Sequence, residues 1–396
     1  MKNKILILSI FIISVIGFSQ NKWQEKMSDR DENFFTIEND FEIFKQSKMS
    51  NSDVIPKGLG IKQFERWRYY WKNRVDANGN FPEEGHVLNE MKKYRLNQAS
   101  FRYASGTGTW QQLGPIPIPT NGTGQLNGSG RLNCITFHPT NPNIIYVGAP
   151  AGGFWKSEDN GASWTEYSNG LVRLGVSSIV VHSTNPNIIY IGTGDRDAGD
   201  APGYGVWRSL DGGLTWASHN SGMGNRTVNE LVMDPTDSNK MYAACNNGYI
   251  YRTTNAGATW SQSSFLGDNP MDIALHPSNP TIIYVGTYNG GEFHRSTNSG
   301  VSFTQITSGL GTTGNRLALA VSPNQPNWVY ALIGNSSGLV GVYRSTDSGL
   351  NFSVRTNTPN ILGYDITGGT GSQSFYDLVI VADPTNADVI YTGGIN

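Results

Sequence analysis

The sequence predicts an all-β protein assembled from repeated four-stranded antiparallel sheets. Three observations lead to this fold class: a glycine-rich and weakly charged composition, a short motif that occurs five times, and a second motif that alternates with it. The chain has 396 residues, of which 47 are glycine and 15% are charged. Glycine is thus about 12% of the chain, against an ordinary usage of roughly 7%, which is typical of a turn-rich protein.

The composition also excludes several classes of protein. The glycines lack the three-residue period of collagen, and the 11% of aromatic residues argues against disorder. The formal net charge of −2 provides no basic excess, so we expect no nucleic-acid partner. The two cysteines, Cys134 and Cys245, are too few for a disulfide scaffold.

Residues 1–19 have the features of a secretory signal peptide. Lys2 and Lys4 precede an apolar run from residue 5 to residue 18, and Gly17 and Ser19 supply the small residues at the cleavage site. The run is shorter than the roughly 20 residues that span a bilayer. We therefore predict an exported protein, secreted or at the cell surface, with no integral membrane segment after cleavage.

The segment from residue 20 to residue 105 differs from the rest because it is densely charged. Its apolar residues recur every three or four positions, as in Phe34, Ile37 and Phe41, which predicts helices. We therefore divide the chain into a signal peptide at 1–19, a charged helical leader at 20–105 and a β region at 106–396.

An eight-residue motif occurs five times in the β region. The first copy runs from Ser157 to Trp164 and has a serine or threonine, then an aspartate or asparagine, a glycine and an aromatic residue. The acidic or amide side chain suits a turn in which it accepts bonds from N–H groups two residues on, and the glycine can adopt positive φ. We interpret the following motif residues as structural: Ser157, Asp159, Gly161, Trp164, Ser209, Asp211, Gly213, Trp216, Asn255, Gly257, Trp260, Asn298, Gly300, Phe303, Asp347, Gly349 and Phe352.

A strand–turn–strand motif alternates with the eight-residue motif and places a tyrosine at one repeated position. Together the two motifs give four strands per roughly 45 residues, which is the size of a β-propeller blade. The predicted blades are 130–170, 176–221, 227–265, 271–308, 316–357 and a partial blade at 375–396. Because the sixth blade stops after its second strand, we expect an incomplete ring and a truncated sequence.

The eight-residue motif is identified as the Asp box, and residues 107–396 resemble the Asp-box β-propellers. These include sialidases, sortilin-type receptors and xyloglucanase-like glycoside hydrolases. With its charged leader, the chain is similar to large secreted propeller proteins of gliding Gram-negative bacteria. The resemblance implies export by the type IX machinery and places the Asp boxes away from the ligand face.

An enlarged loop in the second blade concentrates carboxylates. Asp195, Asp197 and Asp200 lie within six residues of one another, and they repel unless a cation or an arginine is close. Oxygen ligands at such short spacing suit Ca²⁺, and a carboxylate there also suits acid or base catalysis of glycoside hydrolysis. The third interpretation is a polar loop that supports its own turns.

Two further groups of residues are candidate ligand contacts. An insertion before the last two strands carries Tyr364, Asp365 and Tyr376, which could stack on and hydrogen-bond to a sugar or a peptide. Tyr204, in the enlarged loop, is a further candidate of this kind. Three arginines precede or begin the first strands of their blades and could bind an anion or pair with carbonyl groups at the channel; they are Arg131, Arg226 and Arg316.

The function predicted from these residues is binding, with glycan or protein as the ligand. The sialidase arginine signature is absent. The xyloglucanase-like resemblance implies a catalytic aspartate just before Gly152-Gly153-Phe154, but Pro150 occupies its position and cannot transfer a proton. We therefore expect an exported binding propeller without a catalytic set. The alternative is a glycoside hydrolase whose acid or base comes from Asp195, Asp197 or a region outside this sequence.

Overall fold

The computed structural model describes residues 22–27, 29, 31–48, 60–83, 85–87, 89–90, 93–94, 130–168, 170–199, 201–311, 314–364 and 371–394. The chain divides into two compact units, Met1–Gly106 and Thr107–Asn396. The signal peptide predicted at 1–19 lies outside the described residues. Within the described ranges, no helix is both long enough and apolar enough to cross a membrane.

The first unit is a small helical bundle with an aromatic core. Its helices are α1 (Lys22–Lys26), α2 (Phe34–Lys48) and α3 (Ile61–Trp71). The rings of Phe41 and Phe64 stack with centroids 3.6 Å apart, and Trp23 meets both rings edge-on. Charged side chains pair on the outside, as in the 2.9 Å contact between Lys26 and Asp40. The predicted helical spacing thus marks the side of each helix that is buried.

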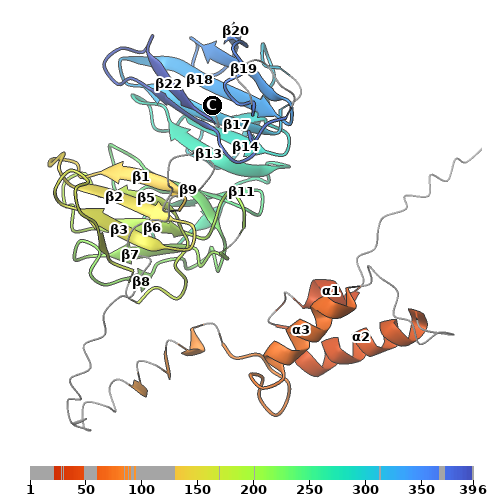
Figure 1. Cartoon of the computed structure of the whole chain (residues 1–396). Coiled ribbons are helices and arrows are strands. Elements are labelled where there is room, and N and C mark those ends of the chain that lie inside the picture. Colours follow the sequence, from red (N-terminus) through yellow and green to blue (C-terminus); the bar gives the residue numbers. More distant parts are fainter. Residues whose placement is uncertain are drawn as a thin grey trace, which may run out of the picture. The chain divides into compact units, whose positions relative to one another are not determined.

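Among the described residues, the second unit is built from five groups of four antiparallel strands and one pair of strands (Figure 1). The fourth and fifth groups are joined into one eight-stranded sheet by the pairing of Tyr288 with Arg316. The first two sheets are β1 (Cys134–Phe137), β2 (Ile145–Ala149), β3 (Gly153–Ser157), β4 (Thr165–Glu166), then β5 (Val176–Val181), β6 (Ile189–Thr193), β7 (Val206–Ser209), β8 (Ala217–Ser218). The next two are β9 (Val228–Met233), β10 (Met241–Cys245), β11 (Tyr249–Thr253), β12 (Ser261–Gln262), then β13 (Asn269–Leu275), β14 (Ile283–Tyr288), β15 (Phe293–Ser296), β16 (Thr304–Ile306). The last are β17 (Arg316–Ser322), β18 (Gln325–Asn335), β19 (Gly338–Ser345), β20 (Ser353–Thr356) and the pair β21 (Val379–Ala382), β22 (Ile390–Gly393).

The sheets pack in chain order through their first strands. β1 contacts β5, β5 contacts β9, β9 contacts β13, β13 contacts β17 and β17 contacts β21. Apolar clusters fill the spaces between successive sheets, as where Tyr190 and Val206 of the second sheet meet Leu231 and Met241 of the third. First strands that succeed one another around a common centre are the inner strands of propeller blades. The predicted all-β arrangement of four-stranded blades is confirmed.

Each Asp box is a turn held by its own side chains. In the first copy, Asp159 Oδ1 accepts bonds from Ser163 N at 2.8 Å and from the Ser157 hydroxyl at 2.8 Å, while Gly161 N donates to Ser157 Oγ. The backbone N–H bonded to the carboxylate belongs to the residue four positions on, not two as expected, because two residues with positive φ, Asn160 and Gly161, turn the chain back.

The tryptophans of the second and third boxes bond to the preceding blade. The indole N–H groups of Trp216 and Trp260 donate to the carbonyls of Tyr167 and His219, each at 2.8 Å. Trp164 belongs to the first sheet and has no earlier blade among the described residues. Its N–H donates instead to its own box at Gly161, and 38% of its surface is exposed. The boxes therefore link successive blades as well as form hairpins.

Candidate functional site

One end of the blades collects the polar side chains that the repeat does not explain. In each sheet the start of the first strand pairs with the end of the second, as Cys134 pairs with Gly148 and Arg316 with Gly334. The loops before first strands and the loops after second strands therefore share this end, which we call the loop face. The Asp boxes follow third strands and lie at the opposite end.

Residues from four blades form a charged cluster at the loop face. Arg131 Nη2 lies 2.7 Å from Asp195 Oδ2, and Arg131 Nη1 lies 3.6 Å from Asp197 Oδ2. Arg316 Nη1 lies 3.0 Å from Asp197 Oδ1 and also donates to the carbonyls of Phe375 and Tyr376. The Arg131 guanidinium lies over the Tyr376 ring, 4.7 Å from its centroid. The structure thus brings together five of the residues singled out in the sequence.

Asp195 and Asp197 have different surroundings within this cluster. The Asp195 side chain has no exposed surface, and its carboxylate also accepts bonds from the N–H groups of Asp197 and Ala198. Asp197 lines a cavity and faces three guanidinium groups, those of Arg131, Arg196 and Arg316. Asp195 therefore fixes its loop, whereas Asp197 is placed to contact a ligand.

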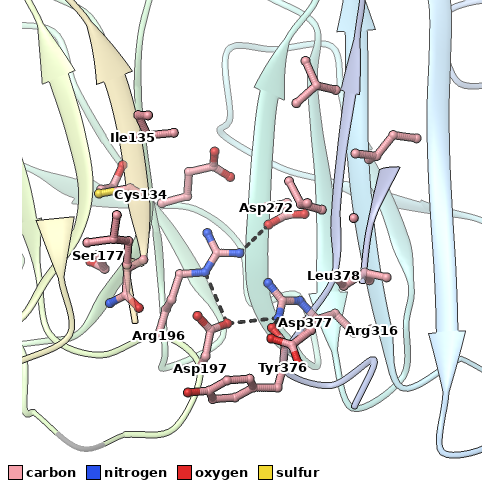
Figure 2. Close-up of a pocket in the computed structure, with 18 of the residues that line it drawn as sticks. Cys134, Ile135, Ser177, Arg196, Asp197, Asp272, Arg316, Tyr376, Asp377 and Leu378 are labelled. Atoms are coloured by element: carbon pink, nitrogen blue, oxygen red, sulfur yellow. Dashed lines mark hydrogen bonds and ion pairs between the residues drawn. The ribbon is translucent and has the colours of Figure 1, made fainter. Parts of the chain in front are cut away.

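A cavity of about 560 Å³ extends from the cluster along the inner strands. Figure 2 shows Asp197, Tyr376, Asp377 and Arg316 near one another at one side of it, with Arg196 reaching toward Asp272. Arg196 Nη2 and Asp272 Oδ1 are 2.8 Å apart. The cavity is bounded by β1 of the first blade and by β21 of the last pair, so both ends of the chain of blades border it.

Two carboxyl groups in this cavity hold their protons more tightly than usual. Burial, reinforced by the charge of Asp272, raises the pKa of Glu230 to about 8. Burial also raises the pKa of Asp377, and the neighbouring charge of Asp197 acts in the same direction. A cavity that contains a carboxyl group with a raised pKa beside a carboxylate paired with arginine has the components for acid–base chemistry.

The other predicted ligand residues lie apart from this cluster. Tyr204 is buried in the core between the first two blades, where its carbonyl accepts the Trp207 indole N–H. Arg226 lies 5.9 Å from the Tyr251 ring centroid, and its Nε donates to the Met223 carbonyl. Tyr364 is exposed beside the Gly363–Ser372 bridge. Asp365 lies outside the described residues.

The calcium interpretation of the acidic loop depends on Asp195, Asp197 and Asp200. Asp200 lies outside the described residues, and arginine side chains neutralise the other two. Across the described parts of the chain, no three histidine, cysteine or acidic side chains are grouped so as to hold a metal ion. Ca²⁺ binding here stays a prediction.

Four charged residues of the cavity were not singled out as candidates in the sequence: Arg196, Glu230, Asp272 and Asp377. A signal for two of them existed in the repeat. Glu230 pairs with Ala244 and Asp272 with Gly286, and these positions match Cys134 and Ser178 in the first two blades. A charged residue at this repeated inner-strand position therefore indicates a residue that lines the cavity.

Comparison with known proteins supports the fold. Residues 204–289 match the Sortilin-Vps10 family, described as sortilin, neurotensin receptor 3. The solved structure of an ancestral GH74 enzyme aligns with a TM-score of 0.53 at 20% identity, over 67% of this chain and 35% of that one. The GH74 enzyme of Niastella koreensis aligns with a TM-score of 0.51 at 20% identity, over 67% of this chain and 44% of that one. The β region is therefore an array of Asp-box β-propeller blades.

Curated relatives are xyloglucanases. The enzyme of Hypocrea jecorina is 31% identical over 120 residues, which are 26% of this chain and 14% of that enzyme. A xyloglucanase of Acetivibrio thermocellus is 29% identical over 222 residues, which are 45% of this chain and 26% of that enzyme. The matches thus span about a quarter or less of the length of these relatives.

These relatives correct the function expected from the sequence. The prediction of a binding propeller without a catalytic set is wrong, because the curated relatives are xyloglucanases. Pro150 at the position of the expected aspartate therefore does not exclude a hydrolase. The findings favour the glycoside hydrolase alternative.

Proposed function

We propose that this chain is part of a glycoside hydrolase that cleaves a polysaccharide at the loop face of its propeller. One observation carries the proposal: a chain that is similar to xyloglucanases over part of its length gathers Asp197, Glu230 and Asp377 around one cavity. Glycoside hydrolysis commonly uses two carboxyl groups, one that donates a proton and one that accepts a proton or stabilises positive charge.

The surroundings of the carboxyl groups suggest their roles. Asp377 has a raised pKa and lines the cavity, so it is suited to donate a proton to the glycosidic oxygen. Asp197 is held by Arg316 and Arg131, so its negative charge is fixed in place where it can face the positive charge that develops on the sugar ring. Pro150, which occupies the position of the expected aspartate, takes no part in proton transfer.

The ligand and the location follow from the same proposal. A polysaccharide is the partner, and the sugar chain lies across the loop face. We further propose that the signal at residues 1–19, with its two lysines and its apolar run, directs export. Type IX export machinery is the proposed route.

Reducing-sugar release from xyloglucan and mixed-linkage β-glucan tests the function. With purified protein that contains this whole sequence, we expect hydrolysis of at least one of these polymers. Asp377→Asn should lower kcat by about 10²- to 10⁴-fold, the usual contribution of a general acid. Asp197→Asn should also lower kcat.

Asp237→Asn is the matched control, because Asp237 lies in the β9–β10 turn at the opposite end of its blade. Its activity should equal that of the wild type. Full activity of both Asp377→Asn and Asp197→Asn would refute these residue roles. No sugar release from any neutral polysaccharide would refute the hydrolase function itself.

A further inference from the structure

A second groove on the loop face, of about 620 Å³, has five asparagines in its lining and lies between the second, third and fourth blades. We call it the asparagine groove. The amides come from the segment before β9, from β9 itself, from the β10–β11 turn and from the start of β13: Asn225, Asn229, Asn246, Asn247 and Asn269. Asp195 and Arg196 lie at its border with the charged cluster.

Hydrogen bonds fix the orientation of the central amide. Asn229 is 1% exposed, and its Nδ2 donates to the Pro270 carbonyl at 2.7 Å and to Asn269 Oδ1 at 3.2 Å. A carbonyl oxygen only accepts hydrogen bonds, so the atom of the Asn229 amide that faces Pro270 must be Nδ2. The amide atom that points away from Pro270 is therefore Oδ1. Within the described residues, this buried Oδ1 has no hydrogen-bond partner.

Asn247, on the β10–β11 turn, is a second asparagine with an amide oxygen that is unpaired within the described ranges. Its Nδ2 donates to the Tyr251 hydroxyl at 3.2 Å, and that hydroxyl in turn donates to Gln262. Asn247 Oδ1 is likewise buried without a partner among the described residues. Buried polar atoms in folded proteins are nearly always paired with protein or water, so two unpaired acceptors beside one groove are available to donors from a ligand.

The chemistry of these atoms selects the class of ligand. Amide oxygens accept hydrogen bonds, and hydroxyl groups donate them, whereas an ionised carboxylate has no hydrogen to donate. The charged groups at the border are already compensated, Asp195 by Arg131 and Arg196 by Asp272. Arg226 also lines the groove, where its Nε donates to the Met223 carbonyl. The neutral character of the ligand is therefore inferred from the two unpaired amide oxygens and not from an absence of charge.

We propose that the asparagine groove is a binding subsite for the hydroxyl groups of a neutral sugar chain, next to the carboxyl groups of the cavity. The inference rests on the proposed hydrolase function for the identity of the sugar chain. It goes beyond that function because it assigns sugar contacts to Asn229 and Asn247.

Calorimetric titration with cellohexaose and with a xyloglucan oligosaccharide tests the subsite. Asn247→Ala removes one acceptor and should weaken binding by about 5- to 10-fold, the value of one neutral hydrogen bond. Asn247→Asp retains an acceptor oxygen and should bind within about 2-fold of the wild type. Asn239→Ala is the control, because this exposed asparagine lies in the turn at the other end of the same blade.

The outcomes separate this subsite from the hydrolase function. Unchanged binding and KM in Asn247→Ala, with normal hydrolysis by the wild type, would overturn the subsite and leave the hydrolase proposal intact. Weakened binding in Asn247→Ala without any hydrolysis by the wild type would support the subsite and refute the hydrolase. Tighter binding of oligogalacturonate than of cellohexaose would overturn the neutral-sugar assignment.

Discussion

At the scale of single residues, the Asp box shows that charge is incidental to its turn. Asp211 Oδ1 accepts a bond from Thr215 N at 2.9 Å, and its Oδ2 accepts the Thr215 hydroxyl at 2.6 Å. Asn255 bonds to Thr259 in the same way, except that its Nδ2 donates to the threonine hydroxyl. The hydroxyl can act as donor or acceptor, so the turn accommodates either side chain.

Asp211→Asn should therefore leave the stability at pH 7 nearly unchanged, whereas Asp211→Ala should lower the free energy of unfolding by about 1–2 kcal/mol through lost hydrogen bonds. The bond with Thr215 lowers the pKa of Asp211 below its ordinary 3.8. The stability from this depressed pKa is present above about pH 3.8 and is lost as the pH falls through the folded value. Urea unfolding of the wild type and both variants at pH 7 and pH 3 measures these differences. An asparagine variant as unstable as the alanine variant at pH 7 would contradict the prediction that the turn accommodates either side chain.

Glu230 should give the opposite pH dependence. Its pKa is raised from 4.5 to about 8, so the folded protein keeps a proton that the unfolded chain releases. Stability should fall as the pH rises between these two values. Glu230→Gln can still accept the Ile273 N–H bond that Glu230 Oε2 accepts at 2.7 Å. We expect this variant to be more stable than the wild type at pH 8 and to lose this pH dependence, as measured by urea unfolding across pH 5–9. Equal slopes in both proteins would refute a buried neutral Glu230.

At the scale of elements, the blade repeat was predictable and the pairing of side chains across blades was not. The Asp boxes and the strand–turn–strand motif depend on local chemistry, so their spacing locates hairpins directly. Arg131 and Asp195, by contrast, are 64 positions apart in the sequence and meet because consecutive inner strands pack side by side. The sequence identifies Arg131 and Asp195 as candidate site residues separately. No local pattern shows that an arginine, and not a bound cation, neutralises the carboxylates of the enlarged loop.

The role of the box aromatic residue as a link between blades gives a prediction at this scale. Trp260 is 5% exposed and its indole reaches the second blade, whereas Trp164 has no earlier described blade to contact. Trp260→Ala should lower the free energy of unfolding by about 3–5 kcal/mol, as for other buried large aromatic residues. Trp164→Ala, in the same motif, should cost clearly less. Thermal unfolding of both variants tests this, and equal losses would show that the box aromatic stabilises only its own hairpin.

At the scale of the whole β unit, the charged cluster connects blades that are distant in sequence. Arg316 begins the fifth blade, yet its guanidinium reaches Asp197 of the second blade and the carbonyls of Phe375 and Tyr376 before β21. Its side chain is 2% exposed. A buried guanidinium that bonds to separate blades ties them around the cavity, and its removal leaves a carboxylate poorly compensated.

Arg316→Met should therefore lower the free energy of unfolding by about 3–5 kcal/mol, the usual effect of removing one partner of a buried ion pair. Adding Asp197→Asn should restore part of this loss, because the second substitution removes the charge that was left without its closest partner. Urea unfolding of the wild type, the two single variants and the double variant gives the coupling energy. Because Arg131 and Arg196 also face Asp197, recovery should be partial. If the losses of the two single variants simply add in the double variant, Arg316 acts through its carbonyl contacts alone. The Asp197 carboxylate would then be held by Arg131 and Arg196.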